Sequence, residues 1–522
     1  MRPKKVFIDS RMSKDASKTN KEGEGSKEAS ASVLHGMNRG WFLFVWLSVM
    51  VALAAIVLMK TDVYNKFESD SQEQTKHEEV DISKKGKETE LYAKKSITNK
   101  ADFKIRKKLD EADTLLEMND LEKAAMKYDK ILNKHPESVR AMSGKAQVMD
   151  KMAEQKRSNA LLEEYISLAS KAIQMVDIPA DLLLQVAERL ADRQQFRGWM
   201  KKALKTRKLV AEKFPENLVL QNKLGVGYIM ANELNEAKDV FRQVLAVSSM
   251  DGYALCHLGF LLKTFDHEME EAIPLLEAGI KTKDPGTADG RFYMHLGDAL
   301  QRVGKNDEAY KYFNEGADLG FFRSAYQRSL YNSDVDSQGW WTMEQTGYQK
   351  YFKMLEENWE TIRDEGMAQM DPATGAFHPE EENLREKGDW KQFTLYQRGR
   401  KVDSSCAKTP KTCALIDKFP DAKSCKRGQV KFSVMQPGVH VWPHCGPTNS
   451  RIRAHLGLVV PEGPKIRVVN ETRTWMEGKF IVFDDSFEHE VWHDGTQLRL
   501  VLIVDVWHPD ITEKQRSQLS PI

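Results

Sequence analysis

Two histidines and two arginines lie close together in a segment that also contains a turn. The segment VWPHCGPTNSRIRAHLGL, residues 441–458, carries His444, Arg451, Arg453 and His455 in an otherwise apolar frame. Imidazole nitrogens bind transition metals, and guanidinium groups form paired hydrogen bonds with carboxylates. The segment therefore indicates a metal beside an anionic small molecule, although a histidine near a strand end is more often a hydrogen-bonded structural group.

A second segment, FDDSFEHEVW, supplies a partner for His444. His489 lies 45 residues after His444, and Arg499 follows ten residues later within LRLVLIV. Non-haem Fe(II) oxygenases commonly hold iron with two histidines and one carboxylate, and leave positions open for a 2-oxo acid and O2. An arginine in an apolar strand is costly to bury unless an anion meets it, so Arg499 suits the distal carboxylate of 2-oxoglutarate.

The position two residues after His444, where such an iron site has its acidic ligand, is Gly446. Glycine offers no side-chain ligand, so Asp484, Asp485 or water must supply the third one. We favour water, with Asp485 orienting a water or an imidazole from outside the ligand set. A zinc hydrolase is a further interpretation, but it lacks an obvious third histidine and leaves Arg499 unexplained.

Short strands must position these residues. After about residue 340 the chain contains runs of β character separated by Pro, Gly and Asp: QVKFSVM, HLGLVV, KIRVV, KFIVF and LRLVLIVDVW. Many short strands with few helices among them indicate a double-stranded β-helix of the jelly-roll or cupin type over residues 340–522. Such a fold can bring His444 and His489 together.

Residues 101–335 have helical periodicity and an internal repeat. Leu-Gly pairs at 224–225, 258–259 and 296–297 are each followed by an alanine and then a large apolar residue; these are Ala237 and Phe241, Ala272 and Leu276, and Ala309 and Phe313. The spacing resembles tetratricopeptide repeats, which stack pairs of helices into a superhelix and usually bind peptides. An ordinary helical bundle is the alternative. The chain is thus predicted to be an α + β multidomain protein.

An uncharged apolar segment, WFLFVWLSVMVALAAIVLM, covers residues 41–59. It is close to the length needed to cross the ~30 Å hydrocarbon layer as a single transmembrane helix. A signal peptide is the alternative, but the segment is long for one and Lys60 follows it without a small-residue cleavage site. Lys and Arg recur through residues 1–40 and are sparser over 60–81, which predicts a cytosolic N-terminus.

The flanks of this segment are polar. Residues 1–40 are predicted to be a disordered cytosolic tail, and residues 60–100 a flexible charged stalk on the other side of the membrane. The net charge of +1 argues against nucleic acid as the main partner. The oligomeric state is left open.

All five cysteines follow the predicted membrane span, and the oxidising lumen expected there permits disulfides. Cys406 and Cys413 lie in CAKTPKTC, a short loop that a disulfide can close, whereas a metal site would need a second Cys or His pair. Asn470-Glu-Thr is the only glycosylation sequon.

Five segments together resemble the aspartyl/asparaginyl β-hydroxylase family, which comprises 2-oxoglutarate-dependent oxygenases of the endoplasmic reticulum: GDWKQFTLYQRG, HVWPHCGPTNSRIRAHLGL, VNETRTWMEGK, FDDSFEHEVW and IVDVWHP. The resemblance runs from about residue 340 to the end. The repeat region and the single N-terminal span match the architecture of the family as well.

This resemblance implies a role for each matching residue. His444 and His489 match the two Fe(II) ligands, and Gly446 matches the missing carboxylate of the family. The positions that match 2-oxoglutarate-binding residues are Trp390, Ser433, Arg453, His455 and Arg499. The positions that match peptide-binding residues are Gln392, Gln429, Arg451 and Glu381, the last standing where the family has an aspartate. Cys406 and Cys413 match a family disulfide.

The implied activity is hydroxylation of the β-carbon of Asp or Asn in EGF-like domains, with Fe(II) as cofactor and 2-oxoglutarate and O2 as co-substrates. The implied setting is the endoplasmic reticulum membrane, with a type II span and a luminal catalytic domain. The competing hypothesis is a membrane-anchored repeat scaffold with a catalytically inert jelly roll, which the missing carboxylate favours.

Overall fold

The computed structural model of the chain describes residues 92–371 and 376–522. The chain divides into two compact units between Gly198 and Trp199. The predicted tail (1–40), the predicted membrane span (41–59) and most of the predicted stalk lie outside the described residues. Within the described ranges, none of the helices has the length and apolar character needed to cross a membrane.

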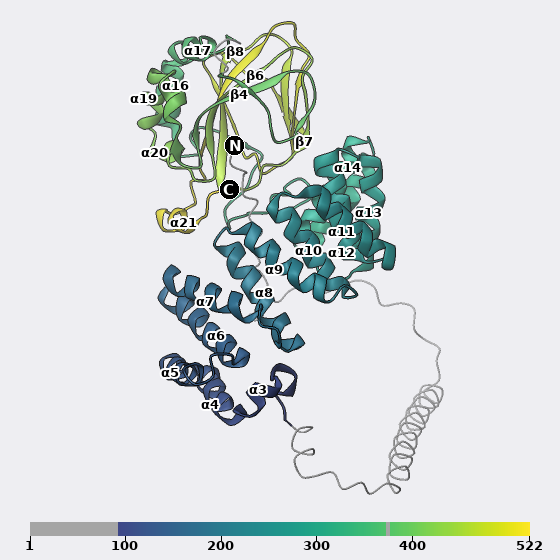
Figure 1. The fold of residues 1–522 in the computed structure, drawn as a ribbon. Coiled ribbons are helices and arrows are strands. Elements are labelled where there is room, and N and C mark those ends of the chain that lie inside the picture. The colour runs from purple at the N-terminus through teal and green to yellow at the C-terminus, as the bar shows by residue number, and fades with distance from the viewer. Residues whose placement is uncertain (1–91, 372–375) are drawn as a thin grey trace, which may run out of the picture. The chain divides into compact units, whose positions relative to one another are not determined.

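The described part of the first unit is a run of helices (Figure 1). They are η1 (Lys95–Ile97), α3 (Lys100–Phe103), α4 (Arg106–Glu117), α5 (Leu121–Leu132), α6 (Val139–Lys156), α7 (Asn159–Ala172) and α8 (Ala180–Phe196). The phenol of Tyr92 donates to Asp110 of α4 at 2.6 Å, and the Lys94 amine pairs with Asp113 at 2.9 Å. Residues 92–100, predicted to be the end of a flexible stalk, therefore belong to the folded unit instead.

The second unit begins with more paired helices. They are α9 (Met200–Lys213), α10 (Leu218–Ala231), α11 (Leu234–Val247), α12 (Gly252–Leu261), the π-helical turn η2 (Leu262–Asp266), α13 (Met269–Thr282), α14 (Gly290–Arg302) and α15 (Asn306–Asp318). Gly225 of α10 lies against the ring of Phe241 in α11, and Gly297 of α14 lies against that of Phe313 in α15. Because the glycines lack a Cβ, each ring fills the space between two helices. The predicted repeat region is therefore a tetratricopeptide-like helical array.

The β-rich C-terminal part contains two antiparallel sheets. The larger runs in the order β1-β11-β8-β13-β6-β4-β2, with β5 paired to β4, and the smaller in the order β10-β9-β12-β7-β3. The strands of the larger sheet are β1 (Trp340–Trp341), β2 (His378–Pro379), β4 (Trp390–Gln397), β5 (Arg400–Lys401), β6 (Gln429–Met435), β8 (Arg451–Val459), β11 (Phe480–Phe483) and β13 (Arg499–Trp507). Those of the smaller are β3 (Arg385–Lys387), β7 (His440–His444), β9 (Pro464–Val468), β10 (Glu471–Arg473) and β12 (His489–His493). Each apolar run predicted to be a strand is one.

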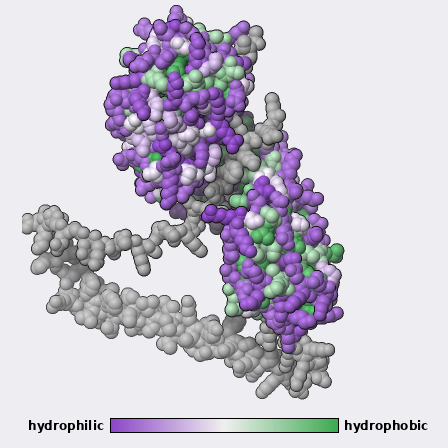
Figure 2. Space-filling view, turned by 90° about the vertical axis from the view of Figure 1, so that its left-hand side faces the viewer, coloured by the Kyte–Doolittle hydropathy of each residue, from purple (hydrophilic) through white to green (hydrophobic). Residues whose placement is uncertain are grey.

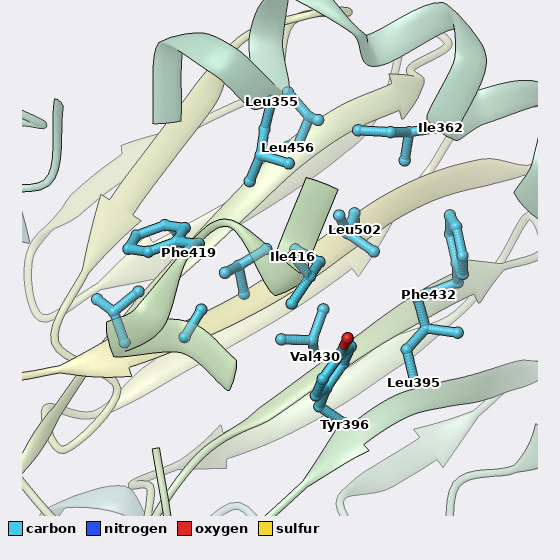
Figure 3. Close-up of a cluster of buried hydrophobic side chains, with 14 of the residues drawn as sticks. Leu355, Ile362, Leu395, Tyr396, Ile416, Phe419, Val430, Phe432, Leu456 and Leu502 are labelled. Carbon is cyan, nitrogen blue, oxygen red and sulfur yellow. The ribbon is translucent and has the colours of Figure 1, made fainter. Parts of the chain in front are cut away.

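Two apolar clusters hold this part together. One lies between the sheets, where Val441 and Val491 of the smaller sheet meet Phe483 and Val501 of the larger. The other covers the opposite face of the larger sheet, where helices pack on it (Figures 1 and 3). These helices are α16 (Gln349–Glu357), α17 (Trp359–Met367), α18 (Asp403–Cys406), α19 (Pro410–Asp417) and α20 (Pro420–Lys423); a last helix, α21 (Glu513–Gln518), follows β13. The larger sheet is therefore covered by apolar packing on both faces, which makes it a rigid platform.

The surface of the described residues is mainly hydrophilic on the face drawn in Figure 2. Hydrophobic side chains that remain exposed, such as Met118, Val176 and Met476, lie on separate elements. This agrees with the 30% of charged residues in the sequence.

Candidate active site

His444 and His489 lie directly opposite each other on neighbouring strands. His444 ends β7, His489 begins β12, and the two are register partners in an antiparallel pair. Their ring centroids are 4.1 Å apart. The ring of Phe483, from the facing sheet, makes an edge contact with the His489 ring, and the two ring centroids are 5.4 Å apart. The two strands thus bring together imidazoles that are 45 residues apart in the sequence.

Both imidazoles are held in the same orientation by their own backbone. Nδ1 of His444 donates to the Trp442 carbonyl at 2.7 Å, and Nδ1 of His489 donates to the Phe487 carbonyl at 2.9 Å. A carbonyl only accepts, so each Nε2 is left with its lone pair when the ring is neutral. Burial lowers the pKa of His444. Burial is also the main cause that lowers the pKa of His489 well below its usual value, and the neighbouring His444 is the second. Two neutral imidazoles with fixed tautomers are suited to bind a divalent metal.

Asp485 occupies the space beside Gly446. The Gly446 amide donates to the Asp485 carbonyl at 2.5 Å, and a Cβ added at Gly446 would lie 2.5 Å from Oδ2 of Asp485. The carboxylate of Asp485 is fully buried and pairs with Nη2 of Arg451 at 2.5 Å and with Nη1 of Arg453 at 3.0 Å. No side chain longer than hydrogen fits at 446 without displacing this carboxylate, which explains the glycine.

Asp485 stays ionised in this setting. Burial alone would raise the pKa of its carboxyl, but the guanidinium groups of Arg451 and Arg453 hold that pKa below its usual range. Among the described residues, no group of three His, Cys, Asp or Glu side chains is arranged to hold a metal ion. Within the described structure, His444 and His489 each leave Nε2 without a hydrogen bond to the backbone, so these two side chains fit a metal here.

Arg499 is a buried cation whose guanidinium is only partly satisfied. It is 1% exposed, Nη2 donates to Oγ of Ser433 at 3.1 Å, and Nε has no hydrogen-bond partner in the described part of the chain. Its guanidinium lies 4.9 Å from the centre of the Trp475 ring, and burial lowers the pKa of Arg499 to about 9. A guanidinium buried in this way is costly unless an anion completes it. The surroundings of Arg499 therefore fit a carboxylate ligand.

Three more side chains complete the surroundings of Arg499. Nε1 of Trp390 donates to Oγ of Ser433 at 2.9 Å, which links Trp390 to the arginine through the hydroxyl. His455 accepts from Nε1 of Trp475 at 3.3 Å through Nδ1, while its Nε2 has no partner among the described residues. Burial, and then Arg453 and Arg499, lower the pKa of His455 well below its usual value. Its Nε2 hydrogen is therefore a neutral donor available to a ligand.

Residues 356–509 match the family model described as Aspartyl/Asparaginyl beta-hydroxylase. The chain therefore carries a domain of this family. The chain is 51% identical over 431 residues to the human aspartyl/asparaginyl beta-hydroxylase. The aligned residues make up 82% of this chain and 57% of the relative. The mouse protein of the same name is also 51% identical, over 82% of this chain and 58% of its own length. This chain thus spans little more than half of these relatives.

Other matches cover single parts of the chain. The human aspartate beta-hydroxylase domain-containing protein 2 is 35% identical over 32% of this chain and 47% of its own length. Among solved structures, a tetratricopeptide repeat protein from Parabacteroides merdae aligns with 41% of this chain and 78% of its own at 16% identity and a TM-score of 0.32. The repeat protein YrrB aligns with 34% of this chain and 86% of its own at 20% identity and a TM-score of 0.28.

Arg453, predicted to bind 2-oxoglutarate, is already paired within the hydroxylase domain. Its Nε and Nη2 donate to the two oxygens of Asp505 at 2.7 and 2.9 Å, and Nη1 pairs with Asp485. Arg451, predicted to face the peptide, shares Asp485 and also donates to the Arg427 carbonyl at 2.5 Å. The sequence did not lead us to Asp505. It is the only charged residue in the apolar run LVLIVDVW, and a buried carboxylate of this kind needs a cationic partner.

The other predicted peptide-binding residues lie on or before the neighbouring strands β4 and β6. The side-chain carbonyl of Gln392 in β4 accepts from Nζ of Lys431 at 2.8 Å, and the backbone N–H of Gln429 donates to Asp505 at 3.0 Å. Lys431 is buried, which lowers its pKa to about 8, and sequence analysis missed it. Glu381 is exposed. Its neighbour Glu382 is exposed as well.

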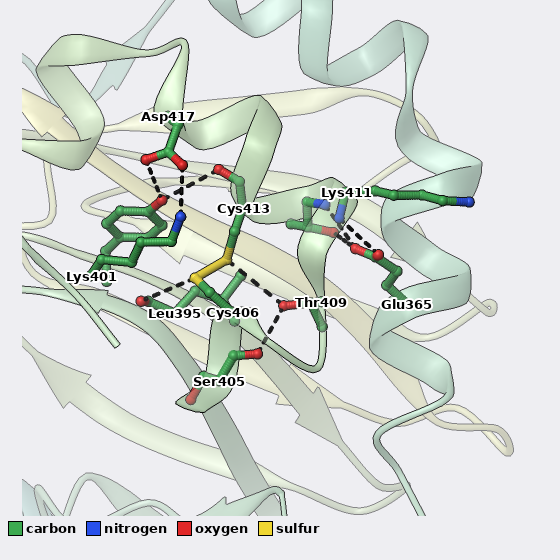
Figure 4. The surroundings of a disulfide bond; sticks show 11 residues. Glu365, Leu395, Lys401, Ser405, Cys406, Thr409, Lys411, Cys413 and Asp417 are labelled. Carbon is green, nitrogen blue, oxygen red and sulfur yellow. Dashed lines mark hydrogen bonds and ion pairs between the residues drawn. A yellow bond between two sulfur atoms is a disulfide. The ribbon is translucent and has the colours of Figure 1, made fainter. Parts of the chain in front are cut away.

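The remaining predicted modifications lie away from these residues. Cys406 and Cys413 form a disulfide between α18 and α19 (Figure 4). The backbone amides at the start of α19 are anchored by Glu365, which accepts from Lys411 and Thr412 at 2.9 and 2.7 Å. Asn470 is exposed in the turn between β9 and β10, where a sugar chain would meet solvent.

Proposed function

We propose that the chain is an Fe(II)- and 2-oxoglutarate-dependent dioxygenase that hydroxylates the β-carbon of Asp or Asn side chains. The observation that supports this most directly is the pair of neutral imidazoles, His444 and His489. Ring contacts through Phe483, His455 and Trp475 link them to Arg499, a buried guanidinium whose Nε lacks a partner among the described residues. A binding module without chemistry has no need for both features in one domain. Membership of the hydroxylase family, at 51% identity to the human relative, supports the same reaction.

In this proposal His444 and His489 bind Fe(II) through their Nε2 atoms. The iron supplies the activation of O2: one oxygen atom enters the β-C–H bond of the substrate as a hydroxyl, and the other enters 2-oxoglutarate, which leaves as succinate and CO2. The residues of the chain keep the imidazoles neutral and oriented, through the Trp442 and Phe487 carbonyls. Asp485 keeps a negative charge close to the ligands, as expected for a group that orients a water or an imidazole.

Arg499 and its neighbours bind 2-oxoglutarate in this proposal. The free Nε of Arg499 and the Ser433 hydroxyl receive the distal carboxylate, and the rings of Trp390 and Trp475 bound that part of the site. Nε2 of His455 donates to the same ligand. Arg453, which is already shared by Asp485 and Asp505, acts instead through the position of Asp485.

The substrate class in this proposal is the EGF-like domain of secretory-pathway proteins. Gln392, Gln429, Arg451 and Glu381 are the proposed peptide contacts, and Lys431 adds a buried cation beside Gln392 that suits an acidic peptide. The tetratricopeptide-like helices supply a second peptide-binding surface. The paired sheets fit the double-stranded β-helix expected for such oxygenases.

We further propose a type II protein of the endoplasmic reticulum membrane, anchored by residues 41–59, with the hydroxylase domain in the lumen. The uncharged segment and the charge asymmetry around it support the anchor and its direction. The disulfide between Cys406 and Cys413 supports an oxidising compartment.

The second candidate function is a membrane-anchored repeat scaffold with an inert β domain. The observation that favours it is the lack, among the described residues, of a third side chain placed to hold a metal. Under this alternative the two imidazoles and Arg499 no longer form an active site, and the domain has no catalytic activity.

One experiment separates the two functions. The chain is incubated with Fe(II), 2-oxoglutarate, O2 and an EGF-like domain that carries an Asp or an Asn; succinate and the mass of the peptide are measured. The hydroxylase proposal predicts succinate together with a gain of one oxygen atom, both abolished by His489→Ala in a chain that still folds. Iron-loaded, folded wild-type chain that yields neither product would leave only the scaffold.

A further inference from the structure

Glu488 is a buried carboxylate next to His489 that the proposed reaction does not use. Its side chain is 0% exposed. The phenol of Tyr310, in α15, donates to it at 2.7 Å, and the guanidinium of Arg328, in the segment after α15, pairs with it at 2.9 Å. Both partners belong to or directly follow the helical array, so the helices contact the residue that precedes a proposed iron ligand.

The helices and the smaller sheet make further contacts with Glu488. Nε2 of Gln301, in α14, donates to Glu488 at 3.3 Å, and Arg467 of β9 lies 3.4 Å away. Arg328 in turn lies over the Phe313 ring of α15 at 3.7 Å, which fixes the cation to the helices. The Glu488 carboxylate is thus bonded from the helices by Gln301 and Tyr310 and from the sheet by Arg467, which makes it an anchor shared by both.

The backbone around Glu488 is fixed as well. Its amide donates to the Tyr326 carbonyl at 2.7 Å, and its own carbonyl accepts from the Val469 amide at 2.9 Å. Phe487, whose carbonyl orients the His489 ring, forms a β-bridge with Gln327. The position of His489 is thus determined on one side by its strand neighbours and on the other by the segment that leaves α15.

We propose that Glu488 is a positioning residue through which α14 and α15 hold His489 in the place where it binds metal. The helical array then contributes to the iron site itself, in addition to any role in peptide binding. This inference rests on the proposed function, because it requires His489 to be a metal ligand. The simpler alternative is that the Tyr310–Glu488 contact only joins two parts of the unit and leaves metal binding untouched.

Two tyrosines of α15 provide a matched pair for the test. Tyr310 donates to Glu488, whereas Tyr312 donates to Glu277 of α13 at 2.5 Å. Tyr310→Phe and Tyr312→Phe each remove one hydroxyl that bonds to a carboxylate. Glu488→Gln keeps the shape of the anchor and removes its charge.

Co(II) is titrated into the full-length, metal-free chain, and its binding is measured by the ligand-field absorption of the ion. Thermal unfolding is recorded for each variant. Loss of a residue that orients a metal ligand typically weakens metal binding by about 10- to 100-fold. We expect a loss of about that size for Tyr310→Phe and Glu488→Gln, and wild-type affinity for Tyr312→Phe at a similar change in melting temperature. Wild-type Co(II) affinity in both Tyr310→Phe and Glu488→Gln overturns the inference alone. A wild-type chain that binds no Co(II) overturns both the inference and the proposed function.

Discussion

At the scale of single residues, the two arginines Arg453 and Arg499 differ in the partners of their guanidinium groups. Arg453 pairs with the carboxylates of Asp485 and Asp505, whereas Arg499 contacts the Ser433 hydroxyl and the ring of Trp475. Removing one partner of a buried ion pair typically costs about 3–5 kcal/mol, because it leaves an uncompensated buried charge. A buried charge that has no counter-ion is itself costly, so removing it should not destabilise the fold. The same substitution should therefore have opposite effects at the two positions.

We expect Arg453→Met to lower the free energy of unfolding of the ligand-free chain by about 3 kcal/mol, because it removes one of the two guanidinium groups that Asp485 and Asp505 share. Arg499→Met should leave that free energy unchanged or raise it, and should weaken 2-oxoglutarate binding by roughly 100-fold, which corresponds to about 3 kcal/mol. Denaturant unfolding and calorimetric titration of 2-oxoglutarate measure the two effects. A strongly destabilised Arg499→Met chain would show that the guanidinium has a structural partner, against the assignment made here.

Asp484, the neighbour of Asp485, makes stability depend on pH. Burial raises the pKa of its carboxyl to about 7, so the folded chain keeps a proton that the unfolded chain loses near pH 4. The favourable contribution of this group is therefore complete below about pH 4 and is lost as the pH rises to about 7. Asp484→Asn, which imitates the protonated form, should gain stability over wild type by up to about 1.4 kcal/mol per pH unit across that window. Parallel pH profiles for the two proteins would contradict the raised pKa.

At the scale of elements, the hydrophobic pattern predicted the strands well because each is bounded by Pro, Gly or Asp. QVKFSVM is β6 without any change of bounds, and the Leu-Gly and alanine repeat marked the helix pairs. The sequence did not show which strands pair, since β7 and β12 are neighbours in the smaller sheet although four other strands separate them along the chain. For the same reason the pairing of Asp485 with Arg451 and Arg453, and the part played by Glu488, became visible only in three dimensions.

The contact between Gly297 and Phe313 tests the helix pairing directly. A methyl group at 297 would overlap the Phe313 ring, which is fully buried and has no room to retreat. We expect Gly297→Ala to lower the free energy of unfolding by about 1–3 kcal/mol, despite the better helix propensity of alanine. Adding Phe313→Leu should restore part of the loss, which a double-mutant cycle by denaturant unfolding measures. Purely additive losses would mean that the two residues do not meet.

At the scale of the whole molecule, the hydroxylase domain and the helices α9–α15 belong to one compact unit that begins at Trp199. If α14 and α15 help to hold His489, the place at which the chain is shortened decides whether the metal site survives. A chain of residues 199–522 keeps Gln301, Tyr310 and Arg328, whereas a chain of residues 340–522 leaves the Glu488 carboxylate without all three.

We expect the 199–522 chain to bind Co(II) with about the affinity of the full-length protein. The 340–522 chain should bind it about 10-fold more weakly or worse, in line with the loss of groups that orient a metal ligand. Co(II) titration measures this, and circular dichroism confirms that the shorter chain retains its strands. Equal affinity in a folded 340–522 chain would show that the β domain holds its imidazoles unaided, and would confine the helices to binding the peptide.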